Sequence, residues 1–100
     1  MEIIKATSDT VACTLTPDEH QQVSSAWQAL FRRALIVREA VAGGIRLTFA
    51  PDAENELRRL IEIEAECCSW VTFALDGSSV TMTADGIGEQ AVREMWVPEK

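Results

Sequence analysis

The fold is decided by residues 51–86, which read PDAENELRRLIEIEAECCSWVTFALDGSSVTMTADG. Pro51-Asp52 predicts the start of a helix. Apolar side chains then recur at helical spacing, at Ala53, Leu57, Leu60 and Ile61. The same spacing continues to Glu64, Cys67, Cys68 and Val71. Residues 71–75 and 80–84 instead alternate between apolar and other side chains around Asp76-Gly77, which suits a tight turn and predicts a β-hairpin.

The residues before this stretch predict the same order of helix and strands. Thr16 is a helix N-cap, Pro17 suits the first helical position, and Glu19 completes a capping box. The apolar stripe that follows predicts a helix ending near Arg33. Residues 35–49 then alternate on both sides of Gly43-Gly44, so they predict another hairpin.

Short elements are expected at the two ends of the chain. Residues 11–15 alternate and predict a first strand, with Cys13 on its buried face. Residues 1–10 form a loosely held lead-in, with room for a short strand at Ile3-Ile4. Asp85-Gly86 predicts the cap of a final short helix, which Pro98 ends.

The order strand, helix, hairpin, helix, hairpin, helix indicates the α+β class. We expect one domain over residues 1–100, with a ferredoxin-like split βαβ arrangement. Helices should cover one face of an antiparallel sheet, and the C-terminal helix is an addition to that arrangement. One hundred residues suffice to bury such a core without disulfide bonds.

Composition excludes several classes of function. The formal net charge of −7 disfavours binding to nucleic acid, because phosphate contacts need clustered Lys and Arg. No apolar run is long enough to span a membrane, and the first residues lack the pattern of a signal peptide, so we expect a cytoplasmic protein. In that compartment the three cysteines should be thiols.

The expected topology brings the chemically distinctive side chains to one end of the molecule. The first strand ends there with Cys13, the first helix begins there with His20, and the second helix ends there with Glu64, Cys67 and Cys68. Thiolates favour soft cations. The sequence therefore predicts a site for Zn(II), Hg(II) or Cu(I), with Cys67, Cys68, Cys13 and Glu64 as metal ligands.

Local geometry and charge favour a metal over other uses of the cysteine pair. Adjacent helical residues point about 100° apart, so Cys67 and Cys68 can face one ion only where the helix ends. Their adjacency disfavours a mutual disulfide. The helix C-terminus and Glu62, Glu64 and Glu66 make the surroundings negative, which disfavours a nucleophilic thiolate but stabilises a bound cation.

Simple packing is the alternative for each of these residues. Burial alone explains Cys13, since free cysteine is among the most buried residue types. For the pair Cys67-Cys68, site and packing are equally open. His20 is better explained as a helix-surface residue. Glu64 is the residue that packing does not explain, because an unpaired buried carboxylate is costly.

The remaining hypotheses concern surfaces and catalysis. Trp70 and Trp96 are expected to close the core at helix ends, or else to line a pocket, and Met82 and Met95 to fill gaps. A domain with buried cysteines would use its sheet face or the Trp70 region for a small ligand, a partner or a homodimer contact. A thiol redox enzyme ranks last, so no catalytic residue is assigned.

Three segments together resemble a family of small bacterial domains of unknown function. These segments are residues 64–73 (EAECCSWVTF), 12–15 (ACTL) and 44–49 (GIRLTF). Domains of that family occur alone or appended to mercury-resistance-type transcriptional regulators. A proline commonly follows their cysteine pair, whereas Ser69 stands at that position here. The resemblance implies a heavy-metal or thiol-reactive ligand, without the DNA-binding helix-turn-helix of the regulators.

Overall fold

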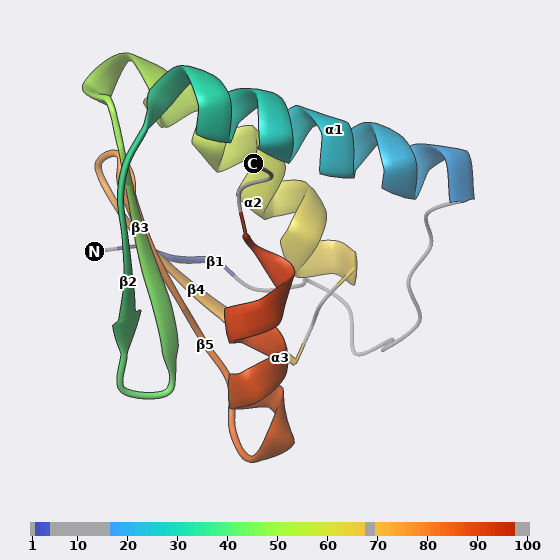
Figure 1. The fold of residues 1–100 in the computed structure, drawn as a ribbon, viewed down its shortest axis with the longest axis vertical. Helices are drawn as coiled ribbons and strands as arrows, with labels where there is room; N and C mark the ends of the chain where they lie inside the picture. Colours follow the sequence, from blue (N-terminus) through green and yellow to red (C-terminus); the bar gives the residue numbers. More distant parts are fainter. Residues whose placement is uncertain (1, 5–16, 68–69, 98–100) are drawn as a thin grey trace.

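A computed structural model describes residues 2–4, 17–67 and 70–97 of the chain. Its elements are β1 (Glu2–Ile4), α1 (Pro17–Ala34), β2 (Leu35–Val41), β3 (Gly44–Phe49), a 3-10 turn η1 (Pro51–Ala53), α2 (Glu54–Cys67), β4 (Thr72–Asp76), β5 (Ser79–Thr83) and α3 (Ile87–Met95) (Figure 1). The α+β class is therefore confirmed, as is the helix that follows the last hairpin.

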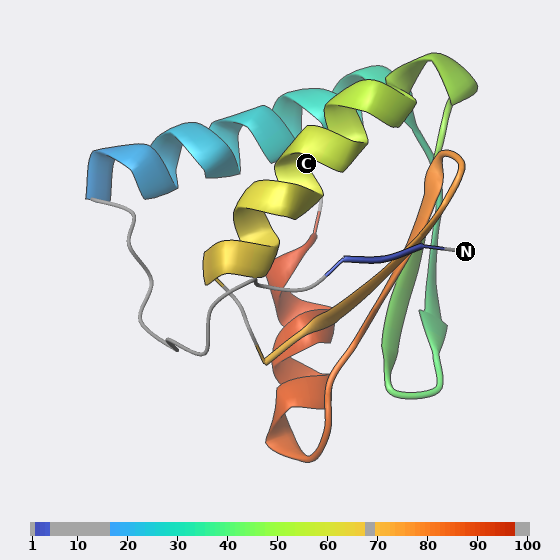
Figure 2. The same cartoon turned by 180° about the vertical axis from the view of Figure 1, so that it is seen from behind.

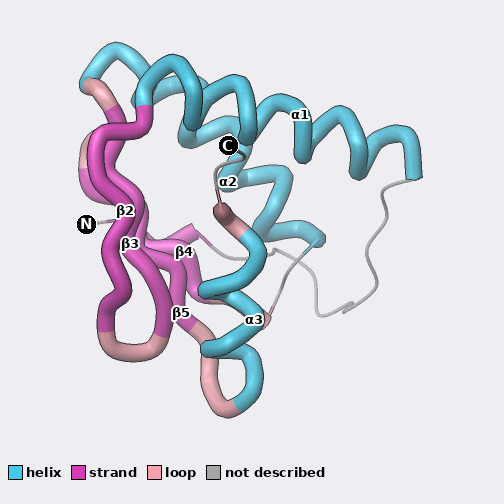
Figure 3. The backbone as a smooth tube through the Cα atoms, viewed as in Figure 1, coloured by secondary structure: helices cyan, strands magenta, loops and turns pink. Residues whose placement is uncertain are grey.

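The five strands form one open antiparallel sheet in the order β1-β4-β5-β3-β2 (Figure 3). Both predicted hairpins are present, as β2–β3 and β4–β5. The expected strand at Ile3-Ile4 is β1, which pairs with β4 at the edge of the sheet. The strand predicted over residues 11–15 and the cap at Thr16 lie outside the described residues. Within the described part, the centre of the sheet is β5, between β4 and β3.

Helices cover one face of this sheet, as predicted, in a ferredoxin-like type of arrangement (Figure 2). The strand residues that face the helices are buried and apolar: Ile45, Leu47, Phe49, Phe73, Leu75, Val80 and Met82. The opposite face carries polar side chains that include Arg46, Thr48, Ser79 and Thr81. A one-residue slip of any strand would exchange these two sets, so the pattern fixes the register.

Aromatic side chains from helices and strands meet in the core. The Trp96 ring lies edge-on to Phe73, with centroids 5.9 Å apart, and edge-on to Trp27 at 6.4 Å. Trp96 therefore closes the core, as predicted. Met82 is fully buried as expected. The prediction for Met95 is wrong, since it is 45% exposed and lies off the α3 stripe that buries Val92 and Trp96.

Close approach of two strands explains one glycine. Gly44 is the first residue of β3, where a β-carbon would overlap the carbonyl oxygen of Met82 on β5. The sequence interpretation placed Gly44 in the turn with Gly43, whereas the structure needs it inside the sheet, where only glycine fits. None of the helices in the described ranges is long and apolar enough to cross a membrane.

Candidate functional site at the end of helix α2

Helix α2 reaches the first residue of the cysteine pair, where a described range of the chain stops. Its last helical residue is Cys67, and the chain has left helical geometry by Trp70, which lies in a turn ahead of β4. The beginning of α1 and the end of α2 point toward the same side of the molecule (Figures 1 and 2). This agrees with the directions that the sequence predicts for the two helices.

Most of the predicted ligand atoms lie outside the described part of the structure. Cys13 and Cys68 are outside the described ranges, as are the side chains of Cys67 and His20. Of the four predicted metal ligands, only Glu64 has a described side chain. Among the described residues, no three His, Cys, Asp or Glu side chains are grouped to hold a metal ion. The convergence of the thiols therefore stays a prediction.

Glu64 has a structural partner that the sequence did not reveal. Its side chain is half-buried, and the indole Nε1 of Trp27 donates a hydrogen bond of 2.9 Å to Glu64 Oε1. The expectation that packing offers no reason for this carboxylate is therefore wrong, because the hydrogen bond compensates part of its desolvation.

The last turn of α2 differs in charge from those of α1 and α3. α1 ends with Arg32 and Arg33, and α3 has Arg93 in its last turn. α2 has no basic residue in its last turn, where Glu64 and Glu66 lie beside Cys67. A helix C-terminus carries a partial negative charge that cations stabilise. The last turn of α2 therefore contains two acidic residues and a cysteine, but no basic residue.

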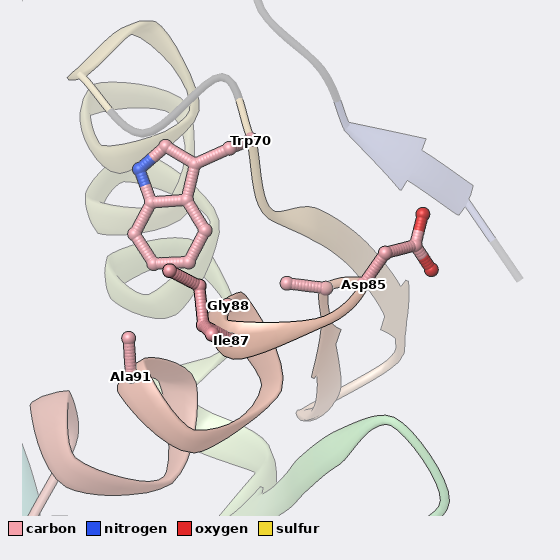
Figure 4. A pocket seen from close by; sticks show the side chains of 6 residues that line it. Trp70, Asp85, Ile87, Gly88 and Ala91 are labelled. Atoms are coloured by element: carbon pink, nitrogen blue, oxygen red, sulfur yellow. The ribbon is translucent and has the colours of Figure 1, made fainter.

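A cleft lies just beyond this helix end. Trp70, Ala84, Asp85, Ile87, Gly88 and Ala91 line a cleft of about 540 Å³ between the chain after α2 and the start of α3 (Figure 4). Trp70 is 43% exposed, so the expectation that it closes the core is wrong, and the alternative that it lines a pocket is confirmed. Its indole lies against α3 at Gly88, outside the buried core.

The sequence alone missed the α3 residues of this cleft. Gly88 and Ala91 are small residues one helical turn apart, which is the signal that a bulky side chain can lie across them. That bulky side chain is Trp70. The sequence does not show that it reaches Gly88, because this contact depends on how α3 packs.

Comparisons of the chain with protein-family models, curated proteins and solved structures find no match. What the fold defines is therefore a class: an α+β domain with an open antiparallel sheet, three helices on one face, and two neighbouring features at the end of α2. These features are the negative helix end that carries Cys67 and the apolar cleft beside Trp70.

Proposed function

We propose that this protein is a small cytoplasmic binding domain that holds a soft metal ion at the end of α2. The ligands are Cys67 and Cys68, with Cys13 and Glu64 completing the site. The observation that carries the proposal is the last turn of α2, which contains Glu64, Glu66 and Cys67 and no basic residue. Such a helix end favours a cation and disfavours a free thiolate.

The chemistry of the ligands supports Zn(II), Hg(II) or Cu(I) over harder ions. Thiolate sulfur prefers soft cations, and a bound cation supplies the positive charge that deprotonates the thiols. The two neighbouring thiols would face one ion only where the helix does not continue through the pair, because adjacent helical residues point about 100° apart. A Zn(II) ion would complete four-coordinate geometry with three thiolates and the Glu64 carboxylate.

Metal binding should release protons and stabilise the fold. Ligand thiols must lose their protons, and a site that the unfolded chain lacks stabilises the folded state by mass action. At a Zn(II) concentration 100 times the Kd, the midpoint of thermal unfolding should rise by about 10 to 20 °C. The measurement is a titration of the reduced protein with Zn(II), followed by pH in weak buffer and by thermal unfolding.

The decisive variant of this titration is Cys67→Ser with Cys68→Ser, which should lose both the proton release and the thermal shift. Ala26→Ser with Ala29→Ser is the matched control, since it makes two changes to serine on the exposed side of α1. That control should titrate like the wild type. Unchanged metal affinity in the double cysteine variant would contradict the proposal, and unreactive native thiols would favour the packing alternative.

Glu64→Gln separates the two roles of that side chain. The amide oxygen of glutamine can still accept the hydrogen bond from Trp27, so the fold should lose little stability. The charge is lost, so Zn(II) affinity should fall about tenfold, the size of effect expected when a metal ligand is weakened. Unchanged affinity in Glu64→Gln would remove Glu64 from the ligand set and leave it a purely structural residue.

A further inference from the structure

The cleft between Trp70 and α3 is an apolar concavity that the metal proposal does not use. We infer that it is a second binding site, for a flat, uncharged aromatic small molecule that stacks on the indole of Trp70. The inference is independent of the metal site, although both lie near the end of α2.

Trp70 provides an aromatic surface whose ring is held in place by packing on α3. A β-carbon at Gly88 would lie 3.3 and 3.4 Å from Cε3 and Cζ3 of the indole, and 2.9 Å from the β-carbon of Ala84. The ring therefore rests against the backbone of α3 at a position that only glycine allows. With 43% of Trp70 exposed, the rest of the ring is accessible to a ligand. Flat aromatic rings stack on such a surface in an offset or edge-to-face geometry.

The other walls of the cleft are apolar and small. Ala84 and Ala91 leave room beside the ring, and Ile87, at the start of α3, is 94% exposed (Figure 4). A volume of about 540 Å³ is within the range of small-molecule sites. A cleft of this volume suits a small molecule better than a protein partner, whose standard interface uses about 20 to 30 residues on each side.

Charge selects an uncharged ligand. Asp85 is the only charged residue among the described ones that line the cleft, and its carboxylate points away from the indole of Trp70 (Figure 4). No cationic side chain is found among its described lining residues, and the whole chain carries a formal net charge of −7, so an anion is disfavoured. The described lining therefore offers an apolar ligand a ring to stack on, and its one charged group is turned away from that ring.

The test uses N-phenyl-1-naphthylamine, an uncharged aromatic dye, titrated into the full chain and followed by dye fluorescence and by quenching of tryptophan emission. Saturable binding of one dye per chain is expected. Ala91→Leu fills the cleft and Trp70→Ala removes the stacking surface, so each should weaken binding by about tenfold or more. Circular dichroism and thermal unfolding check that each variant is folded.

Two exposed isoleucines give a matched control. Ile87→Ser should weaken dye binding several-fold, whereas Ile36→Ser, a change at a 63% exposed residue of β2 that does not line the cleft, should leave it unchanged. Equal binding by wild type and Ala91→Leu would overturn the inference, as would equal effects of the two isoleucine changes.

Two further measurements address the ligand class and the occupant. The sulfonated analogue 8-anilino-1-naphthalenesulfonate should bind more weakly than the uncharged dye, and equal affinity would overturn the assignment to uncharged ligands. Sedimentation should show that the dye does not dissociate a dimer of the protein. Dissociation of a dimer by the dye would mean that a second copy of the chain occupies the cleft, and would overturn the inference. The variant Cys67→Ser with Cys68→Ser should retain dye binding, and its loss from a folded variant would show that the two sites are not independent.

Discussion

The C-terminal ends of α2 and α3 are held in different ways. The carbonyl groups at the end of α3 accept hydrogen bonds from Arg38 of β2, from Nη2 to Arg93 at 2.6 Å and from Nε to Trp96 at 2.8 Å. Trp96 itself is buried in the core. The end of α2 has no basic residue in its last turn and terminates at Cys67. One end is thus neutralised by Arg38 of a neighbouring strand, while the other has no basic residue in its own last turn and would, under our proposal, bind a metal cation.

The largest effect should come from the aromatic residue that anchors α3. Trp96→Ala removes a buried ring that packs on Trp27 and Phe73, and should destabilise the fold by about 3 to 5 kcal/mol. Trp70→Ala removes a ring that is 43% exposed and should cost about 1 kcal/mol. Urea unfolding of both variants measures the difference, and equal losses would contradict the distinction between core and cleft.

The cap that Arg38 provides should have the next largest effect. Arg38→Ala leaves the carbonyls of Arg93 and Trp96 without these charge-assisted hydrogen bonds, at a cost of about 2 kcal/mol. Arg46→Ala is the matched control. The Arg46 side chain lies on the sheet face that the helices leave uncovered, and its ion pair with Glu39 is exposed and 3.4 Å long. That exposed pair should contribute about 0.5 kcal/mol. Similar unfolding midpoints for the two variants would show that Arg38 is not a cap.

The smallest effect is expected from the exposed ion pair between Glu2 of β1 and Arg58 of α2. Its contribution to stability should depend on pH. The hydrogen bond from Arg58 lowers the pKa of Glu2. The stabilisation is therefore present above the ordinary glutamate pKa, about 4.3, and is lost as the pH falls through the lower folded-state pKa. Glu2→Gln should unfold at a slightly lower temperature than wild type at neutral pH.

This small difference should disappear in acid. Thermal unfolding of wild type and Glu2→Gln from about pH 7 to about pH 3 measures it, and added salt should also reduce it. A difference of the same size at both ends of that range would mean that the Glu2 charge is not its source. The partner Arg58 has a raised pKa, so its own titration lies too far to the alkaline side to contribute here.

The sequence predicts which segments form helices and strands better than it predicts which strands lie side by side in the sheet. The helices follow from apolar stripes and the hairpins from Gly43-Gly44 and Asp76-Gly77, because these signals are local. The position of β5 at the centre and of β1 beside β4 is not predicted, because all strands alternate in the same way and pairing depends on long-range packing. The strand expected over residues 11–15 lies outside the described residues.

At the candidate site too, the sequence predicts local features but not the long-range contacts. The end of α2 near the cysteine pair follows from the change to strand-like alternation at Val71. The hydrogen bond between Trp27 and Glu64 joins residues 37 positions apart, so it depends on how α1 packs on α2. Trp70 and Trp96 both flank helices, and the sequence does not show that one rests on Gly88 outside the core while the other is buried.

The metal content of the purified protein tests the central claim most directly. The chain is purified under reducing conditions from cells supplied with Zn(II), in parallel with the variant Cys67→Ser with Cys68→Ser, and both are analysed by elemental mass spectrometry. The account predicts about one soft metal ion per chain in the wild type and almost none in the variant. Equal metal content in the two proteins, or none in either, would contradict it.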